Sequence, residues 1–356
     1  MQNETRSLWP HKDLLDVVEQ DGNVRLVMKD WPIFGLASVH ASSLVLAAGE
    51  GKRMRSSLAK TLHEVAGRPI LEHVLRAVAP LAPARTVVLV GVGGEQVRAR
   101  FGERVNLTFV TQDFSSGYGT GHALRQAAAG LEGFEGNVMV LNGDGPLLRT
   151  ATLAALASAL DGASGMALVT CHFSDPTGLG RIVRDESGRL AAIVEEKDAT
   201  PAQRAITEVN PGVYLFDASV FQRAALLSND NAAGEYYITD LPAIYLRAGE
   251  RVHTVTVDDE TELLGVNDKA QLAEAERVLR ERVRRRWLQE GVTMLDPAST
   301  FIDDRVELAR DVVLEQGVVL RGTTTIGAGA RVGAYSVLTD HAVAPGEAVP
   351  PLTTRP

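Results

Sequence analysis

The sequence predicts an α/β fold, with helices on both faces of a mostly parallel, doubly wound sheet, followed by a short parallel β-helix. Two observations support this prediction. From Ser43 onward, short aliphatic runs alternate with stretches of helical period, and the C-terminal part repeats every six residues. With 356 residues the chain has room for about two domains. We expect an N-terminal extension of unknown role (1–41), a main domain (42–270), a connecting helix (271–291), a β-helix (292–343) and a proline-rich tail (344–356).

The main domain has the alternation that is typical of βα units. Seven aliphatic runs predict strands: Ser43–Ala47, Thr86–Val90, Leu107–Thr111, Val138–Leu141, Met166–Thr170, Val213–Phe216 and Val252–Val257. Apolar residues at spacings of three and four predict helices at Pro69–Ala79, Gly121–Leu131 and Leu153–Leu160. A long charged segment at 271–290 predicts a further helix that ends at Gly291.

The C-terminal segment repeats in hexapeptides. Aliphatic residues stand six apart, and the residue four beyond each is small or β-branched, which predicts a parallel β-helix with a continuous core. The aliphatic positions are Ile302, Leu308, Leu314, Leu320, Ile326, Val332 and Leu338, and the small or β-branched ones are Val306, Val312, Val318, Thr324, Ala330, Ser336 and Ala342.

Composition excludes several classes of protein. The net charge is −9, which disfavours binding to nucleic acid. Cys171 is the single cysteine, so no internal disulfide can form. The N-terminus lacks the pattern of a signal peptide, and no apolar stretch is long enough to span a membrane. We therefore expect a cytoplasmic protein.

Leu46–Met54 contains a glycine-rich loop directly after the first predicted strand of the main domain, where open α/β sheets bind ligands. Gly49 and Gly51 allow close approach of a ligand to the backbone, and Arg53 offers a forked donor for phosphate oxygens. The loop lacks the dinucleotide fingerprint, because Met54 occupies the position of its third glycine. Taken alone, this loop is also compatible with a purely structural turn.

Asp144 lies in the sequence Gly143-Asp144-Gly145-Pro146, again directly after a predicted strand. This sequence is typical of a turn, so a structural role is one interpretation. A carboxylate at the end of a strand is also a suitable ligand for Mg²⁺, which is the other interpretation.

Further blocks follow in a fixed order and, together with the first loop, resemble a known family. They are Lys60 with Gly67-Arg68-Pro69, Gln112 with Gly119–Ala123, Gly143–Leu147, Thr177–Ile182, Ile193–Ala199, Glu208–Asn210, Gly234–Asp240 and Gly265–Asn267. They are similar to the blocks of sugar-nucleotide pyrophosphorylases. With the C-terminal hexapeptides, the chain resembles the bifunctional UDP-N-acetylglucosamine pyrophosphorylase/glucosamine-1-phosphate acetyltransferases over roughly Ser43 to Ala342.

The resemblance implies a Rossmann-like nucleotidyltransferase domain, a left-handed β-helix and a role in making a peptidoglycan precursor. The implied enzyme transfers the uridylyl group of UTP to N-acetylglucosamine 1-phosphate with the help of Mg²⁺, releasing pyrophosphate and UDP-N-acetylglucosamine. Arg53 and Lys60 are then expected to be catalytic, and Asp144 and Asn267 to hold the metal. The expected nucleotide-binding residues are Leu46, Ala47, Ala48, Gly49, Gly51, Lys60, Gln112, Gly119 and Thr120, and the expected sugar-binding residues are Gly180, Glu195, Asn210 and Asn267. We expect His122 to order its loop.

The chain departs from the family pattern in several places. The 113–118 loop is two residues longer and lacks the second glutamine of the uracil-recognition segment, Asn142 replaces an aromatic residue, and Pro211 replaces a threonine. Other nucleotides or sugars, or a non-catalytic sensor of sugar nucleotides, therefore remain alternatives. The β-helix is short, so we expect no acetyltransferase activity and no catalytic role for His341. In the family such β-helices pack as trimers, which makes a homotrimer an option.

Overall fold

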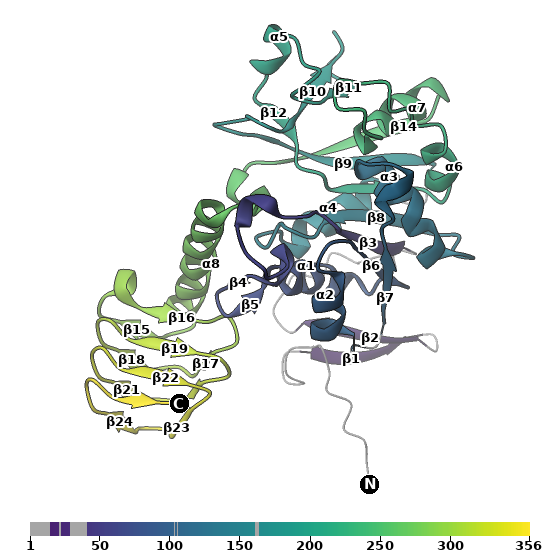
Figure 1. The fold of residues 1–356 in the computed structure, drawn as a ribbon. Helices are drawn as coiled ribbons and strands as arrows, with labels where there is room; N and C mark the ends of the chain where they lie inside the picture. Colours follow the sequence, from purple (N-terminus) through teal and green to yellow (C-terminus); the bar gives the residue numbers. More distant parts are fainter. Residues whose placement is uncertain (1–14, 21–22, 29–40, 103, 105, 161–163) are drawn as a thin grey trace.

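The computed structural model describes residues 15–20, 23–28, 41–102, 104, 106–160 and 164–356 (Figure 1). The predicted strands and helices of the main domain are confirmed with small shifts at their ends. The strands are β3 (Ala41–Ala47), β6 (Thr86–Val90), β7 (Leu107–Thr111), β8 (Asn137–Asn142), β9 (Gly165–His172), β13 (Tyr214–Phe216) and β14 (Arg251–Val257). The helices are α1 (Ile70–Val78), α3 (Thr120–Ala127), which continues as a 3₁₀ turn over Ala128–Leu131, and α4 (Thr150–Ala159).

Several strands and helices were not predicted from the sequence. They are a hairpin, β1 (Leu15–Gln20) and β2 (Asn23–Met28), within the expected extension; β4 (Glu64–Val65), β5 (Arg68–Pro69) and α2 (Gly94–Phe101); and β10 (Gly180–Arg184), β11 (Leu190–Val194), α5 (Pro201–Arg204), β12 (Glu208–Asn210), α6 (Val220–Ala224) and α7 (Leu241–Arg247). The rest of the expected extension, 1–14, 21–22 and 29–40, lies outside the described residues.

One mixed sheet organises the main domain. Its order is β11-β10-β12-β9-β13-β8-β3-β6-β7, and β14 also pairs with β9. The strands β8, β3, β6 and β7 are parallel to their neighbours in this series. β13 then inserts antiparallel between β8 and β9, and the pairs β12–β9, β10–β12 and β10–β11 are antiparallel as well. The parallel half thus carries the βα units that the sequence predicts.

Alternate residues of the central strands face two separate cores. Val45 of β3 packs in the core that includes α1, α2 and α4, whereas its neighbour Leu44 packs in the core that includes α3, α6 and α7. The same alternation occurs in β6, where Val88 and Leu89 belong to different cores. Because successive side chains of a strand point to opposite faces, helices must cover both faces, as in a doubly wound fold.

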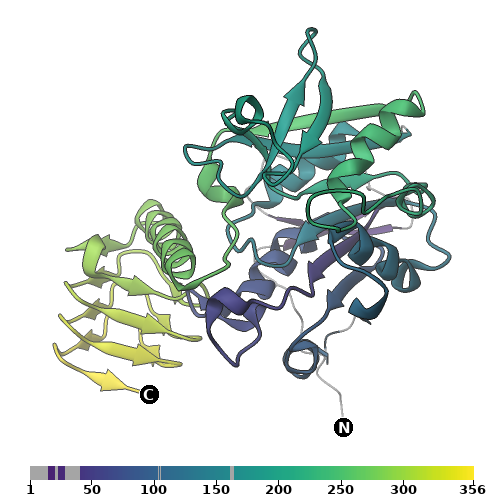
Figure 2. The ribbon, with the colours of Figure 1, turned by 45° about the horizontal axis from the view of Figure 1, so that its top comes forward.

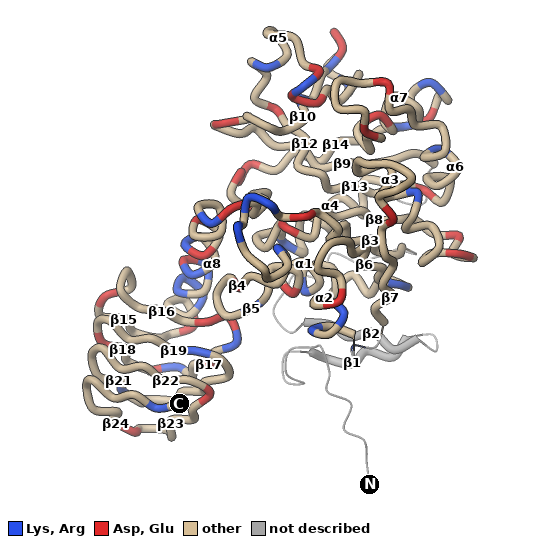
Figure 3. The backbone as a smooth tube through the Cα atoms, in the orientation of Figure 1, with Lys and Arg blue, Asp and Glu red and all other residues tan. Residues whose placement is uncertain are grey.

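The predicted long helix is α8 (Lys269–Gln289), and it lies between the sheet and the C-terminal repeats (Figure 2). The carboxylate of Asp268 caps its first turn by accepting a hydrogen bond from the backbone of Gln271, and Gly291 follows its end with a φ of +92°. Basic and acidic residues alternate along it (Figure 3). Within the described residues, no helix combines the length and the apolar character needed to cross a membrane.

The C-terminal repeats form a parallel β-helix, in which successive coils contribute strands to three parallel sheets. All the aliphatic hexad positions from Ile302 to Leu338 are buried, which confirms the predicted core. The first sheet contains β15 (Thr293–Met294), β18 (Val313–Leu314), β21 (Arg331–Val332) and β24 (Ala348–Val349); the second contains β16 (Phe301–Ile302), β19 (Val319–Arg321), β22 (Val337–Thr339) and β25 (Thr354–Arg355); the third contains β17 (Glu307–Leu308), β20 (Thr325–Ile326) and β23 (Ala342–Val343).

The end of the repeat differs from the prediction. Ala342 is exposed, and Val343, only five residues after Leu338, takes the inward position. This corner is one residue shorter, so the phase of the repeat shifts by one residue, and Val349 then follows Val343 at the usual spacing of six. The expected proline-rich tail instead contributes β24 and β25 to the stack. Its prolines are compatible with the stack because they lie outside these strands, where no ladder hydrogen bond is needed.

The first coil of the β-helix is joined to the main domain by polar contacts. Arg68 donates a hydrogen bond of 2.5 Å from Nε to the carboxylate of Asp304, whose backbone N–H donates to Ala66 O at 2.9 Å. A side chain at Gly67 would collide with Asp303. Burial tends to raise the pKa of Asp304, but the cationic Arg68 and Arg76 outweigh it and hold this pKa below its usual range.

Candidate active site

The loops that follow the parallel strands gather at one edge of the sheet. Because β3, β6, β7 and β8 are parallel, their carboxyl ends all point the same way. The glycine-rich loop after β3 and the Gly143–Leu147 loop after β8 are adjacent, since Gly143 N donates a hydrogen bond of 2.9 Å to Leu46 O. We call this edge the carboxyl edge. It is where ligands bind in open α/β sheets.

Lys60, Asp144 and Asn267 meet at the carboxyl edge. The ammonium of Lys60 lies 2.6 Å from Asp144 Oδ2 and 3.0 Å from Asn267 Oδ1. The side chains of Lys60 and Asp144 are only 12% and 22% exposed, so the ion pair is well shielded from water. Val266 N donates to Asp144 O at 2.8 Å and thereby ties the segment that carries Asn267 to the loop after β8. The structure thus brings together three of the residues that the sequence singled out.

The glycine-rich loop turns tightly over Lys60. Gly51 has a φ of +64°, and a Cβ atom there would lie 2.9 Å from Lys60 Cβ, so a larger residue would displace the lysine. Gly49 has free space around it. Arg53 belongs to a short 3₁₀ helix, Lys52–Met54, and is exposed. Within the described part of the chain Arg53 makes no hydrogen bond or ion pair, so its guanidinium is available to a ligand.

Asp144 and Asn267 form a suitable partial site for Mg²⁺. They offer one carboxylate and one amide oxygen, which are ligands of the kind that this hard cation prefers. Their oxygens already converge on a cation, the ammonium of Lys60. No cluster of three or more His, Cys, Asp or Glu residues that could hold a metal is found among the described residues. Mg²⁺ would therefore take its other ligands from substrate phosphates and water, as is usual for this ion.

Gln112 and the start of α3 form another part of the carboxyl edge. The amide nitrogen of buried Gln112 lies 3.2 Å from His122 Nδ1, while its amide oxygen has no hydrogen-bond partner in the described part. Burial, together with the nearby charge of Arg125, lowers the pKa of His122, so this side chain is neutral at pH 7. Gly119 and Thr120 lie at the beginning of α3. His122 therefore orders the loop around Gln112, in line with the sequence-based expectation.

The predicted sugar residues Gly180, Glu195 and Asn210 form a second cluster. Gly180 pairs with Asn210 between β10 and β12, and a Cβ atom at Gly180 would lie 3.6 Å from Glu195 Oε1. Thr239 donates a hydrogen bond of 2.8 Å to this carboxylate, and Asn210 Nδ2 contacts Tyr214 Oη at 2.7 Å. Burial, with a smaller effect of neighbouring acidic residues, raises the pKa of Glu195. The cluster is polar, with Gly180 and Asn210 buried and Glu195 partly exposed, which suits a site for a polyol.

The fourth expected sugar residue, Asn267, lies with Lys60 and makes no hydrogen bond to this second cluster in the described structure. Asn142 connects the two clusters, because it ends β8 just before Gly143-Asp144 and its Nδ2 donates to Pro211 O at 3.3 Å. Gly212, with a φ of +82°, lies so close to Asn142 that any side chain there would collide with it.

Two side chains that support the site were not predicted from the sequence, Gln96 and Thr239. Gln96 of α2 accepts a hydrogen bond from Ala59 N at 2.9 Å and donates to Ser57 O at 3.0 Å, so it holds the segment before Lys60. No sequence signal marks such an exposed glutamine. Thr239 was inside a recognised block, but its contact with Glu195 depends on the fold.

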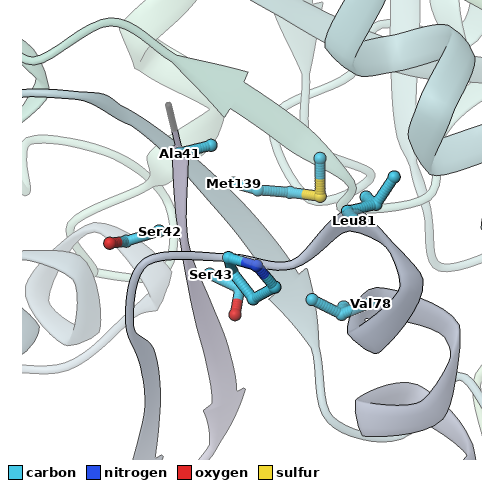
Figure 4. Close-up of a pocket in the computed structure, with 7 residues that line it drawn as sticks. Ala41, Ser42, Ser43, Val78, Leu81 and Met139 are labelled. Carbon is cyan, nitrogen blue, oxygen red and sulfur yellow. The ribbon is translucent and has the colours of Figure 1, made fainter. Parts of the chain in front are cut away.

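A small cavity lies at the other end of β3 and is unrelated to this edge. Residues that line it include Ala41, Ser42, Ser43, Val78 and Met139 (Figure 4). These residues belong to the amino-terminal half of β3 and to elements packed against it, away from Lys60 and Asp144.

Comparison with known proteins shows the family of this chain. Residues 43–293 match the MobA-like NTP transferase domain family. Relatives called bifunctional protein GlmU are 46% identical over 313 residues in Thermobifida fusca, 44% over 313 in Brevibacillus brevis and 47% over 307 in Thermus thermophilus. These matches cover 86%, 87% and 86% of this chain but only 64%, 67% and 66% of the relatives, so the chain spans about two thirds of their length.

A solved structure shows the same fold at low sequence identity. It is a putative glucose-1-phosphate thymidylyltransferase from Bacillus anthracis in complex with a sucrose, with a TM-score of 0.54 and 19% identity. The similarity covers 67% of this chain and 94% of that chain. The chain therefore belongs to the MobA-like NTP transferase family and, within it, to the group of the bifunctional GlmU proteins.

Proposed function

We propose that the protein transfers the uridylyl group of UTP to N-acetylglucosamine 1-phosphate and releases pyrophosphate. The observation that carries this proposal is the convergence of Lys60, Asp144 and Asn267 at the carboxyl edge, next to a glycine-rich loop whose Arg53 has no partner among the described residues. This arrangement places cationic groups and oxygen ligands together, as a triphosphate with Mg²⁺ requires. The similarity to GlmU proteins supports the choice of sugar and nucleotide.

In this reaction an oxygen of the sugar phosphate forms a new bond to the α-phosphorus of UTP. The bond from this phosphorus to the bridging oxygen breaks, and the electron pair leaves with pyrophosphate. No proton has to be removed from the attacking phosphate, so the protein mainly positions two anions and neutralises their charge. A bound Mg²⁺ would supply charge neutralisation and orientation at the phosphates. Asp144 and Asn267 are the residues that would hold it.

Lys60 and Arg53 divide the remaining task. The Lys60 ammonium would donate to phosphate oxygens of the triphosphate when Asp144 and Asn267 hold the metal. Arg53, which has no partner in the described structure, offers a fork of donors to the same triphosphate. Gln112 presents its amide oxygen, which has no hydrogen-bond partner within the described residues and fits the imide N–H of uracil. Glu195 and Asn210 would accept hydrogen bonds from the sugar and position its phosphate.

The proposal is tested by pyrophosphate release from the purified protein with Mg²⁺ and a panel of nucleoside triphosphates and sugar 1-phosphates. We expect the highest kcat/KM with UTP and N-acetylglucosamine 1-phosphate. Turnover that prefers another pair would refute the substrate assignment but keep the reaction class. The absence of pyrophosphate release with every pair would leave a non-catalytic sensor of sugar nucleotides.

A different nucleotide or sugar is the second candidate, and specific observations favour testing it. The 113–118 loop lacks the second glutamine expected for uracil recognition, and Asn142 and Pro211 contact each other beside the sugar cluster. The altered loop and the residues Asn142 and Pro211 change the walls of the site, while Lys60 and Asp144 keep their positions.

A further inference from the structure

The long 113–118 loop is held in one conformation. The carboxylate of Asp113 accepts hydrogen bonds of 2.9 Å from both the backbone and the hydroxyl of Ser115, and Asp113 N donates to Gln126 Oε1 at 2.6 Å. At the other end of the loop, Tyr118 O accepts from Tyr236 N at 2.9 Å. Anchored at both ends, the loop presents its side chains without a large ordering cost on ligand binding.

This loop places two aromatic rings over the carboxyl edge. A Cβ atom at Gly91 would lie 2.5 Å from Ala48 O and 3.0 Å from the ring of Phe114, so Phe114 covers the ends of β3 and β6. The ring centroid of Tyr118 lies 5.3 Å from that of Phe114, with 30° between the planes. Tyr118 is 53% exposed, so one part of its surface is available to a ligand.

Tyr118 also lies near the glycine-rich loop. Its ring contacts Phe114, and Phe114 lies beside Ala48 of that loop, because a Cβ atom at Gly91 would meet both Ala48 O and the ring of Phe114. Two further exposed apolar side chains belong to loops at the same edge: Val92, directly after Gly91, and Leu58, two residues before Lys60. The edge that carries the phosphate-binding groups therefore also exposes apolar and aromatic surface.

We propose that Tyr118, backed by Phe114, is the wall on which the nucleobase stacks. The identity of the nucleotide rests on the proposed function, whereas the stacking contact rests on the geometry of this loop. Every base has a π face, so stacking supplies affinity and tolerates different bases. Selection for uracil then falls to hydrogen bonding by Gln112. The longer loop thus replaces a hydrogen-bonding glutamine with an aromatic surface.

The experiment compares Tyr118→Ala, Tyr118→Phe and a control, Tyr335→Ala, which alters an equally exposed tyrosine on the β-helix. The Kd of UTP is measured by titration calorimetry, and the KM of UTP and of the sugar phosphate by pyrophosphate release. We expect Tyr118→Ala to raise the Kd and KM of UTP about fivefold or more. Tyr118→Phe and Tyr335→Ala should leave both near the wild-type values, and the KM of the sugar phosphate should not change in any variant. Equal melting temperatures would show that the variants are folded.

The outcomes separate this inference from the proposed function. A wild type that turns over UTP, together with unchanged UTP affinity in Tyr118→Ala, overturns the stacking wall alone. A wild type that binds UTP without turnover, and loses that binding in Tyr118→Ala, supports the wall and refutes the enzymatic proposal. A wild type that neither binds nor converts any nucleotide overturns both.

Discussion

Asp144→Asn separates the contribution of Asp144 to stability from its contribution to turnover. In the free protein the carboxylate accepts a hydrogen bond of 2.6 Å from Lys60, and the amide oxygen of asparagine can still accept it. The bond from the charged ammonium therefore stays charge-assisted, and the change removes only the attraction between two opposite charges, worth about 1 kcal/mol in a partly exposed pair. We expect a loss of about 1 kcal/mol in the free energy of unfolding, which corresponds to about 2–4 °C in the melting temperature.

The expected effect on turnover is much larger. Asp144 is the only carboxylate that we assign to the metal, so the variant loses the negative charge that would hold Mg²⁺ against the phosphates. Removal of one preorganised electrostatic group typically lowers kcat by about 10²–10³-fold. Because an amide oxygen binds Mg²⁺ more weakly than a carboxylate, part of this loss should be recovered at high Mg²⁺ concentration.

The assay is pyrophosphate release at saturating UTP and sugar phosphate over a series of Mg²⁺ concentrations, with thermal melting of the same samples. Asp296→Asn is the matched control, because Asp296 caps a short helix of the β-helix domain and asparagine caps equally well. Wild-type turnover of Asp144→Asn at ordinary Mg²⁺ would refute the metal assignment. Loss of both turnover and a cooperative melting transition would show that Asp144 is needed for folding.

Three further predictions follow from the contacts described above. Glu195→Gln should raise the melting temperature at pH 7.5 while raising the KM of the sugar phosphate. The pKa of Glu195 is raised in the folded state, so its stabilising effect is complete below the usual glutamate pKa and is lost as the pH rises through the folded-state pKa. The increase in melting temperature caused by Glu195→Gln should therefore become smaller at lower pH. Asp304→Asn should lower the free energy of unfolding by about 1–2 kcal/mol in urea titrations, because Arg68 loses a charged partner. Its effect should fade on acidification, because the depressed pKa of Asp304 gives stability that is present above the usual aspartate pKa and lost as the pH falls through the folded value. Gln96→Ala should raise the KM of UTP several-fold without changing the KM of the sugar phosphate, because the segment through Ala59 loses two hydrogen bonds.

Each of these predictions can fail in a distinct way. A stability gain of Glu195→Gln that is the same at all pH values would show that its charge is not the cause. An unchanged unfolding curve for Asp304→Asn would mean that the first coil of the β-helix is held by other contacts. Equal increases in both KM values for Gln96→Ala would indicate general loosening of the carboxyl edge rather than a local effect on Lys60.

The elements that the sequence predicted are those with a strong apolar pattern. β6 and β7 were predicted with their observed bounds, because both runs consist of apolar and β-branched residues. α2 was missed because only Gly94, Val97 and Phe101 are buried in it, which leaves too few apolar positions to reveal a helical period. The short strands β10 and β12 contain charged residues such as Arg181 and Glu208, whose partners come from other elements.

The β-helix shows how far a repeat can be extrapolated. The six-residue period holds for as long as each corner has the same length, and it places Leu338 correctly in the core. One shorter corner before Val343 changes the phase, and the prolines that follow then resemble a tail. The strands β24 and β25 could be recognised only from their pairing with β21 and β22 in the preceding coil.

The convergence of the site residues depends on tertiary structure, and the sequence predicted it only in part. Asp144 follows β8 and the glycine-rich loop follows β3, and neighbouring parallel strands bring such loops to one edge, which is a general rule of the fold. Asn267 is 207 residues from Lys60, and no local pattern relates the two. The sequence placed Asn267 in the site only through the family resemblance, and the hydrogen bond from Lys60 to Asn267 is a physical contact that supports this position. Asn267→Asp tests this contact, because it keeps the oxygen near Lys60 and adds a negative charge. If Asn267 is a metal ligand, the variant should need a lower Mg²⁺ concentration than the wild type for half-maximal turnover. An unchanged Mg²⁺ requirement would limit the role of Asn267 to holding Lys60.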